Sequence, residues 1–287
     1  MSTETHRANE FDLQEVGKTL GFYGSIAALV IISFFPIIWI FITSLKPSAE
    51  AIQFPVTYIP QTITLENYRT ALDQEPFLRY LLNSFIVASG TAIIDVFLGA
   101  LAGYALSRLR FKYKVHVLLI ILFSSMLPFM SRLIPLFKLA RDLSLLNNYL
   151  GLILPYAAFQ LPFAVWIMQA YFKELPDSLE EAGLMDGLSR IGILFRIILP
   201  VSAPAMATTG IIVFIYAWNE FLFALTFMTE ESMRTITVGI ALYGGEYTFP
   251  WGTISAAVFM SVVPLIVFMV FFQRKVVEGL TAGFGKA

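Results

Sequence analysis

Long apolar runs alternate with short polar segments along most of this chain. The clearest run extends from Gly21 to Leu45, 25 residues without a charge, which is long enough to cross the ~30 Å hydrocarbon core of a bilayer as a helix. Five further apolar runs follow, some interrupted by proline. The pattern therefore predicts an all-α integral membrane protein with six transmembrane helices, expected at residues 21–45, 83–107, 115–131, 149–172, 205–228 and 251–273.

The distribution of Lys and Arg predicts how these helices are oriented. With six spans, both termini lie on one side, and that side carries twelve Lys and Arg residues against seven on the other. By the positive-inside rule the side with twelve is cytoplasmic. We therefore expect a cytoplasmic N-terminal segment at 1–20, the first transmembrane helix at 21–45, an extracytoplasmic loop at 46–82, a transmembrane core at 83–273 that includes a cytoplasmic segment at 173–204, and a cytoplasmic tail at 274–287.

Several residues within the predicted spans indicate how the helices pack. Gly99 and Gly103 are four residues apart, a spacing that lets a second helix backbone approach closely. Pro128 is expected to break the third span. Asp95 is the one charged residue that is securely in the middle of a predicted span. In the loop before the second span, residues 65–72 are expected to form a short surface helix.

Composition narrows the class of protein. The chain is 57% hydrophobic and only 14% charged, whereas soluble domains carry about 25% charged residues. The net charge of −1 gives no reason to expect nucleic acid, and two histidines with no cysteine leave no multi-histidine or thiolate metal site. The chain contains neither a catalytic constellation nor a complete nucleotide-binding motif. A membrane-embedded enzyme is therefore disfavoured, and we expect no cofactor in this chain.

The most polar stretch of the core, residues 173–196, holds eight charged side chains among 24 residues. Such a charge density is too costly inside a bilayer, so this segment must lie in water. Ser178 and Glu181 have the spacing of a capping box at the start of a helix. Asp186-Gly187 favours a turn, and Ser189 can cap a second short helix. The segment is therefore predicted to form two short helices with a corner between them.

This corner resembles a known motif. In the corner, Glu181-Ala182-Gly183 is followed after three residues by Gly187, after nine more by Ile197, and after one more by Leu199-Pro200. This spacing resembles the cytoplasmic coupling motif of binding-protein-dependent ABC importer permeases. The whole chain looks like a carbohydrate-type permease of the MalG family, with the type I ABC importer (MetI-like) permease fold. Gly183 stands where that family usually has Ala. The resemblance assigns contact with an ATPase to Glu180, Glu181, Ala182, Gly183, Met185, Asp186, Gly187, Leu199 and Pro200.

The resemblance also implies partners and a location. It implies a subunit of an ATP-driven importer of sugars or oligosaccharides in a bacterial or archaeal cytoplasmic membrane, surrounded by membrane lipid. A second homologous permease subunit, two ATPase subunits that bind ATP and Mg, and an extracytoplasmic substrate-binding protein complete such a system. The residues do not identify the sugar, and a polyol, glycerol phosphate or an acidic oligosaccharide are alternatives. An ion-coupled secondary transporter is the alternative mechanism, although it would need more buried ionisable groups than Asp95.

Three further sets of residues are candidates for function. In the fifth span, Trp218, Asn219 and Glu220 are expected either to line the translocation path, or to serve helix packing (Asn219) and to seek the membrane interface (Glu220). By resemblance, Gly244, Gly245, Glu246 and Tyr247 in the loop before the sixth span are expected to touch the binding protein. By the same resemblance, Leu280, Thr281 and Gly283 in the tail are expected to reach the ATPase subunits.

Overall fold

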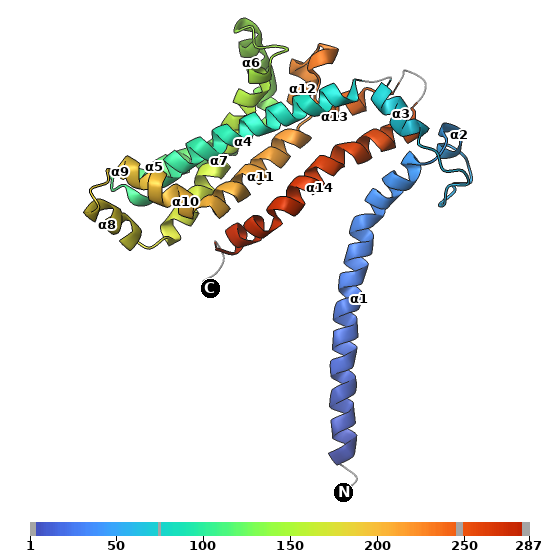
Figure 1. The fold of residues 1–287 in the computed structure, drawn as a ribbon, viewed down its shortest axis with the longest axis horizontal. Helices are drawn as coiled ribbons and strands as arrows, with labels where there is room; N and C mark the ends of the chain where they lie inside the picture. Colours follow the sequence, from blue (N-terminus) through green and yellow to red (C-terminus); the bar gives the residue numbers. More distant parts are fainter. Residues whose placement is uncertain (1–3, 74–75, 245–248, 283–287) are drawn as a thin grey trace. The chain divides into compact units, whose positions relative to one another are not determined.

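The computed structural model describes residues 4–73, 76–244 and 249–282, and at 4–17, 268 and 272–282 it describes only the backbone. The described residues are helical and contain no β-strand (Figure 1). In chain order the elements are α1 (Glu4–Ser44), α2 (Ser48–Ala51), α3 (Glu66–Asp73), α4 (Phe77–Arg108), α5 (Lys114–Ser125), α6 (Phe129–Asp142), α7 (Tyr149–Glu174), α8 (Ser178–Met185), α9 (Arg190–Ile193), the π-helical η1 (Leu194–Ile198), α10 (Leu199–Val201), α11 (Ala203–Asn219), α12 (Leu222–Phe227), the 3₁₀ turn η2 (Glu231–Met233), α13 (Ile236–Ala241) and α14 (Trp251–Ala282).

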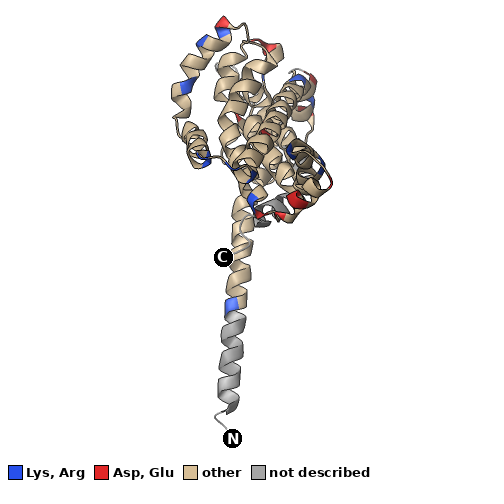
Figure 2. Cartoon of the chain, turned by 90° about the vertical axis from the view of Figure 1, so that its left-hand side faces the viewer, with Lys and Arg blue, Asp and Glu red and all other residues tan. Residues whose placement is uncertain are grey.

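The prediction of an all-α membrane protein is confirmed. Four described helices are long and apolar enough to cross a membrane, and the number rises to six when each of two bent helix pairs is counted as one span. One pair is α5 and α6, which meet at 88° across Pro128, where the sequence predicted a break. The other is the segment Arg190–Val201 with α11, bent by 77°. Figure 2 shows long stretches of helix without charge, with most charged residues near helix ends and in connections.

The chain divides into two compact units, residues 1–71 with 249–259 and residues 72–248 with 260–287. In the first unit, the amide of Asn67 fixes the end of α1 by donating to the carbonyl oxygens of Ser44 at 2.9 Å and Lys46 at 2.7 Å. The Tyr68 hydroxyl lies 2.6 Å from the Ser44 hydroxyl. The predicted surface helix at 65–72 is therefore real, as α3, and it holds the chain that leaves α1.

In the second unit, α4 packs lengthwise against α7 and α11 (Figure 1). A Cβ atom at Gly99 would lie 3.0 Å from the Cβ of Ala164, and one at Gly103 would lie 2.9 Å from the backbone nitrogen of Gln169. The predicted close approach of two helix backbones is thus confirmed, with α7 as the partner of α4. Such contact leaves little room for one helix to slide on the other.

Polar side chains fix the other end of α4 to the segment before α13. The amide of Asn83 donates to the carbonyl oxygens of Ser232 at 2.9 Å and Arg234 at 2.8 Å, and accepts from the hydroxyl of Tyr149 at 2.8 Å. The hydroxyl of Ser84 accepts from the backbone of Ile236 at 2.8 Å. The first residues of the second predicted span therefore also anchor the loop that follows the fifth.

We predict opposite effects for alanine at two helical glycines. Alanine favours helix by roughly 1 kcal/mol over glycine, and at Gly24, where a Cβ would meet nothing within 4 Å, Gly24→Ala should leave the melting temperature of the purified transporter unchanged or raised. Gly103→Ala forces a Cβ against the backbone of α7, so it should lower stability by about 1–3 kcal/mol. A Gly103→Ala protein that melts with the unmodified one would contradict the α4–α7 packing.

Candidate functional site

The polar segment after α7 folds into an elbow, which we define as residues 177–200. Helix α8 ends at Met185, and the chain reverses through Gly187, whose φ of +78° is a conformation that glycine adopts without strain. The backbone of Leu188 donates to the carbonyl of Gly183 at 2.9 Å, and the hydroxyl of Ser189 accepts from the backbone of Gly192 at 3.2 Å. The predicted turn at Asp186-Gly187 and the predicted cap at Ser189 are both confirmed.

Gly183 is explained by the way the elbow closes on itself. It is the only buried residue of α8, and a Cβ atom there would lie 2.8 Å from Cγ1 of Ile193 and 2.9 Å from Cδ1 of Ile197. The glycine lowers the intrinsic helix propensity of α8, which we call the first arm of the elbow. It lets the second arm, formed by α9 and η1 (residues 190–198), pack directly on the first. The two arms are held together by this contact.

An apolar cluster joins the elbow to the long helices. Ile193, Leu194 and Ile198 from the second arm are buried against residues of α4, α7 and α11. Among these, Tyr104 of α4 and Phe172 of α7 pack edge to face with ring centroids 6.2 Å apart. The second arm is therefore part of the core of this unit, while the first arm projects from it.

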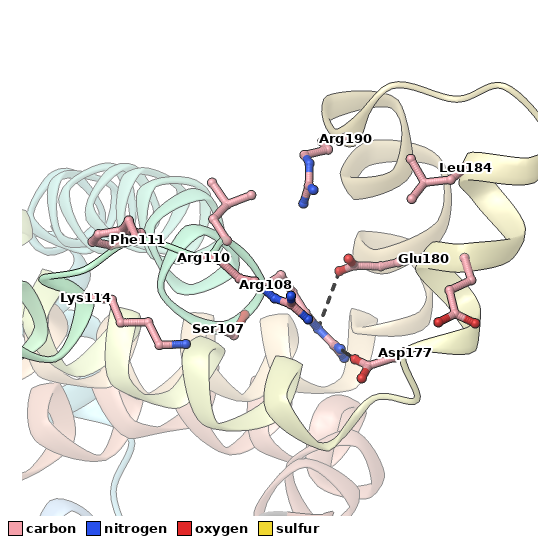
Figure 3. Close-up of a pocket in the computed structure, with 11 residues that line it drawn as sticks. Ser107, Arg108, Arg110, Phe111, Lys114, Asp177, Glu180, Leu184 and Arg190 are labelled. Carbon is pink, nitrogen blue, oxygen red and sulfur yellow. Dashed lines mark hydrogen bonds and ion pairs between the residues drawn. The ribbon is translucent and has the colours of Figure 1, made fainter.

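The first arm is held by Arg108, the last residue of α4 (Figure 3). Its guanidinium donates to the carboxylate of Asp177 and to the carbonyl oxygens of Phe172 (2.6 Å) and Leu175 at the end of α7. Its Nε also lies 3.5 Å from the carboxylate of Glu180. The Arg108 side chain is 7% exposed and that of Glu180 17% exposed, whereas that of Asp177 is 86% exposed, so water screens the pair with Asp177 more than the contacts of Arg108 with Glu180 and the carbonyl oxygens. One side chain thus connects α4, α7 and α8.

The predicted capping box at Ser178 is wrong. Asp177, not Ser178, is the residue before α8, and its side chain makes no capping hydrogen bond. The reason is that its carboxylate is bonded to Arg108 instead. The role of Arg108 was missed from the sequence, where it counted only toward orientation. The available signal was its position as the first residue of a basic loop directly after an apolar span.

A cavity of about 780 Å³ lies beside the first arm, between α8 and the segment that follows α4. Around it lie Arg108, Glu180 and three further cations, Arg110, Lys114 and Arg190 (Figure 3). At the tip of the arm, Met185 is 89% exposed and Leu184 is 52% exposed. The elbow therefore offers an apolar tip next to a charged recess. The predicted coupling residues lie together on this arm except Leu199 and Pro200, which begin α10.

The residues predicted near a translocation path are placed differently from one another. Trp218 is buried and stacks on Phe214, with ring centroids 5.5 Å apart. The side chain of Asn219 is exposed and donates to the carbonyl of Ile215, one turn earlier in its own helix. Among the described residues, the side chain of Asn219 therefore makes no hydrogen bond to another helix.

Glu220 is 8% exposed, so the interpretation of this residue as an acid that seeks the membrane interface is wrong. Its carboxylate accepts from the hydroxyl of Tyr156 and from the backbone N–H groups of Phe223 (3.0 Å) and Ala224 (3.2 Å). Glu220 thus caps α12 at the point where α11 ends and ties this break to α7. The apolar run expected as the fifth span is divided into two helices here.

The remaining candidate residues lie at or beyond the limits of the described chain. Gly244 is described, whereas Gly245, Glu246 and Tyr247 lie outside the described residues. Leu280 and Thr281 lie in the last turn of α14, where only the backbone is described, and Gly283 lies outside. Contacts of these residues with partners stay predictions.

Comparison with known proteins identifies the family. Residues 95–280 match the family of binding-protein-dependent transport system inner membrane components. The chain is 43% identical to the sulfoquinovosyl glycerol transport system permease protein SmoH of Agrobacterium fabrum, with 93% of each chain covered. It is 42% identical to the trehalose/maltose transport system permease protein MalG of Thermococcus litoralis, with 89% of this chain and 92% of that one covered.

The fold agrees with this match. A bacterial ABC transporter for import of the acidic polysaccharide alginate contains a chain that superposes with a TM-score of 0.74 at 25% identity, covering 89% of this chain and 97% of that one. The methionine ABC transporter MetNI, in an inward-facing conformation, has the same fold at 15% identity and a TM-score of 0.53. The predicted family and permease fold are thereby confirmed, and this chain belongs to the binding-protein-dependent transport system inner membrane components, the permease subunits of ABC importers.

Proposed function

We propose that this chain forms half of the translocation path of an ATP-driven importer of sugars or oligosaccharides. The relatives support a carbohydrate, since their names include a sulfoquinovosyl glycerol, trehalose or maltose, and alginate. Two of these three kinds of solute are acidic, so an acidic glycoside belongs among the candidates alongside neutral sugars. The second half of the path belongs to a homologous permease subunit, and an extracytoplasmic binding protein delivers the solute.

Two ATPase subunits, which hold ATP and Mg, drive the cycle through the elbow. The observation that carries this proposal is the Arg108 contact, because it fixes the exposed first arm to the ends of α4 and α7 at once. If a groove in the ATPase binds Leu184 and Met185, a movement of that groove would displace α4 and α7 together. Since α4 and α7 are in backbone contact at Gly103, they would move as one body and open the path on the far side.

The proposed orientation places both termini and the elbow in the cytoplasm. The excess of Lys and Arg on that side supports it. On this orientation Asn219, whose side chain is exposed in the chain, is our candidate for contact with sugar hydroxyls in the outer half of the path, beside Trp218 and Glu220. The loop containing Gly244 faces the binding protein, and the end of α14 with Leu280 reaches toward the ATPase subunits.

A transport assay tests the function. The chain, expressed with its partner subunits and placed in proteoliposomes, should accumulate radiolabelled sugar only with ATP on the elbow side and the binding protein on the other. A protonophore and a sodium ionophore should not abolish uptake. Uptake that survives without ATP but collapses with either ionophore would instead establish an ion-coupled transporter.

Replacing Arg108 should uncouple transport. Arg108→Gln removes the charge that joins α8 to α7, so sugar transported per ATP hydrolysed should fall about tenfold, the effect of losing one charge-assisted bond. Arg108→Lys should not restore it, because an ammonium cannot donate in the fork that meets several acceptors. Lys112→Gln, at an exposed position in the same loop, is the control. Wild-type transport by Arg108→Gln would refute the role of this contact.

Cross-linking tests the contact with the ATPase and its side. The chain has no cysteine, so a single Met185→Cys at the exposed tip should be captured by a cysteine in the groove of the ATPase subunit. It should react with membrane-impermeant maleimide only in inside-out vesicles. Ile59→Cys, 81% exposed in the loop before α3, should show the opposite labelling and no capture. Labelling of Met185→Cys from outside would reverse the orientation.

A further inference from the structure

A second cavity lies in the unit formed by residues 1–71 and 249–259. Its volume is about 640 Å³, within the range of small-molecule sites. The last two turns of α1 contribute Trp39 and Thr43, and the first turns of α14 contribute Trp251 and Ser255. Lys46, just after α1, completes the polar part of the wall. None of these residues takes part in the proposed coupling or translocation.

Lys46 is the unusual member of this cavity. The residue is 2% exposed, and its ammonium donates to the carbonyl of Thr57 and lies 4.9 Å from the centroid of the Trp39 ring. An ammonium has three N–H donors, and among the described residues Lys46 uses one of them. It forms no ion pair with any acidic side chain in that part of the chain. A charge taken out of water in this way is costly without a counter-charge.

The nearest candidate for a counter-charge within the unit is engaged elsewhere. The carboxylate of Glu50 accepts from the hydroxyl of Thr57 at 2.8 Å and from the backbone of Gln61 at 3.0 Å. The bond from Gln61 is the main reason that the pKa of Glu50 lies below its usual value. Glu50 does not line the cavity. The charge of Lys46 makes a smaller contribution to lowering the pKa of Glu50, so the two charges attract each other, but the hydrogen bonds of the Glu50 carboxylate go to Thr57 and Gln61 and leave N–H donors of Lys46 unused among the described residues.

The position of the cavity along the helices indicates the kind of anion. Trp39 and Thr43 are near the end of the apolar stretch Lys18–Ser44, and Trp251 begins the apolar stretch Trp251–Phe271. Tryptophan at the ends of membrane spans lies at the level of the lipid headgroups. A ligand here would meet a cation and two hydroxyls beside aromatic rings, where hydrocarbon chains begin. That chemistry fits a phosphodiester with a glycerol and the first acyl carbons attached.

We propose that this cavity binds the headgroup of one anionic phospholipid, with Lys46 as the counter-charge of its phosphate and Trp39 and Trp251 against its glycerol. On the proposed orientation the lipid belongs to the outer leaflet. A free phosphate ester in solution offers the same charge. It lacks the acyl chains that would continue along the exposed apolar surface of α1, so the lipid is the ligand that the site favours.

Native mass spectrometry of the assembled transporter tests this proposal. After incubation in detergent with equimolar dioleoyl phosphatidylglycerol and dioleoyl phosphatidylcholine, the complex should retain phosphatidylglycerol preferentially. Lys46→Gln should lower the bound ratio about thirtyfold or more, as expected when one partner of a desolvated charge pair is removed, and Lys46→Arg should keep most of it. Lys138→Gln, at an exposed lysine of α6, is the matched control. Equal retention by Lys46→Gln and the unmodified complex would overturn the proposal.

Two further experiments cover a failure of Lys46→Gln to assemble and the binding of a soluble phosphate instead of a lipid. If Lys46→Gln does not assemble, Trp251→Ala removes one wall of the cavity and leaves the bonds of Lys46 in place. It should lower phosphatidylglycerol retention, and unchanged retention would overturn the site. Glycerol 3-phosphate and inorganic phosphate are added separately without lipid. Either compound could raise the melting temperature of the unmodified complex but not that of Lys46→Gln. If the complex also shows no preference for phosphatidylglycerol, the cavity binds a soluble phosphate and the lipid proposal is overturned.

Discussion

The attachment of the elbow to the long helices depends on one buried guanidinium. In the first arm of the elbow, Gly183 is the one fully buried residue and Leu179 is the apolar side chain that packs against the core cluster, so the apolar contact of this arm with the long helices is small. Arg108 supplies what packing does not, by bonding the acids of α8 and the terminal carbonyls of α7 from the end of α4. Those carbonyls have no partner within their own helix. A single side chain therefore satisfies the free carbonyl groups at the end of α7 and attaches the first arm of the elbow to that helix.

The proposed coupling requires that the long helices attached to the elbow move as rigid bodies, and the packing of α4 against α7 meets that condition. The small residues of α4 bring its backbone against α7, where the contact energy comes from close packing and not from expulsion of water. At the opposite end, Asn83 and Ser84 bind the segment before α13. A displacement of the elbow would thus reach the far loops with little loss in between. By contrast, the apolar run that begins with α11 is broken at Glu220, whose carboxylate bonds α7 and the start of α12.

Two buried cations lie near the ends of the apolar helices, and their surroundings differ in an informative way. Arg108 has Asp177 and Glu180 within its own chain. Lys46 has a carbonyl and an aromatic ring but no carboxylate in ion-pair distance among the described residues. A buried cation without a carboxylate in ion-pair distance is a place where a partner or ligand can supply an anionic group. The same reasoning from charge and burial thus leads to an internal contact in one unit and to the proposed ligand site in the other.

The sequence by itself determined the membrane class, the apolar runs, the small-residue face of α4, the turn at Gly187 and the cap at Ser189. Each of these depends on periodicity, charge density or the backbone preference of one or two residues, which are local properties. Only the tertiary structure decided that Arg108 bonds Asp177, 69 positions away in the chain, that Glu220 bonds Tyr156, 64 positions away, and that Lys46 is buried without a carboxylate in ion-pair distance among the described residues. The capping box at Ser178 was wrong because Asp177 already has helical backbone angles, φ −62° and ψ −27°, which makes Ser178 the first residue of α8 and not its cap. The carboxylate of Asp177 is held there by a distant guanidinium, a contact that no local pattern records.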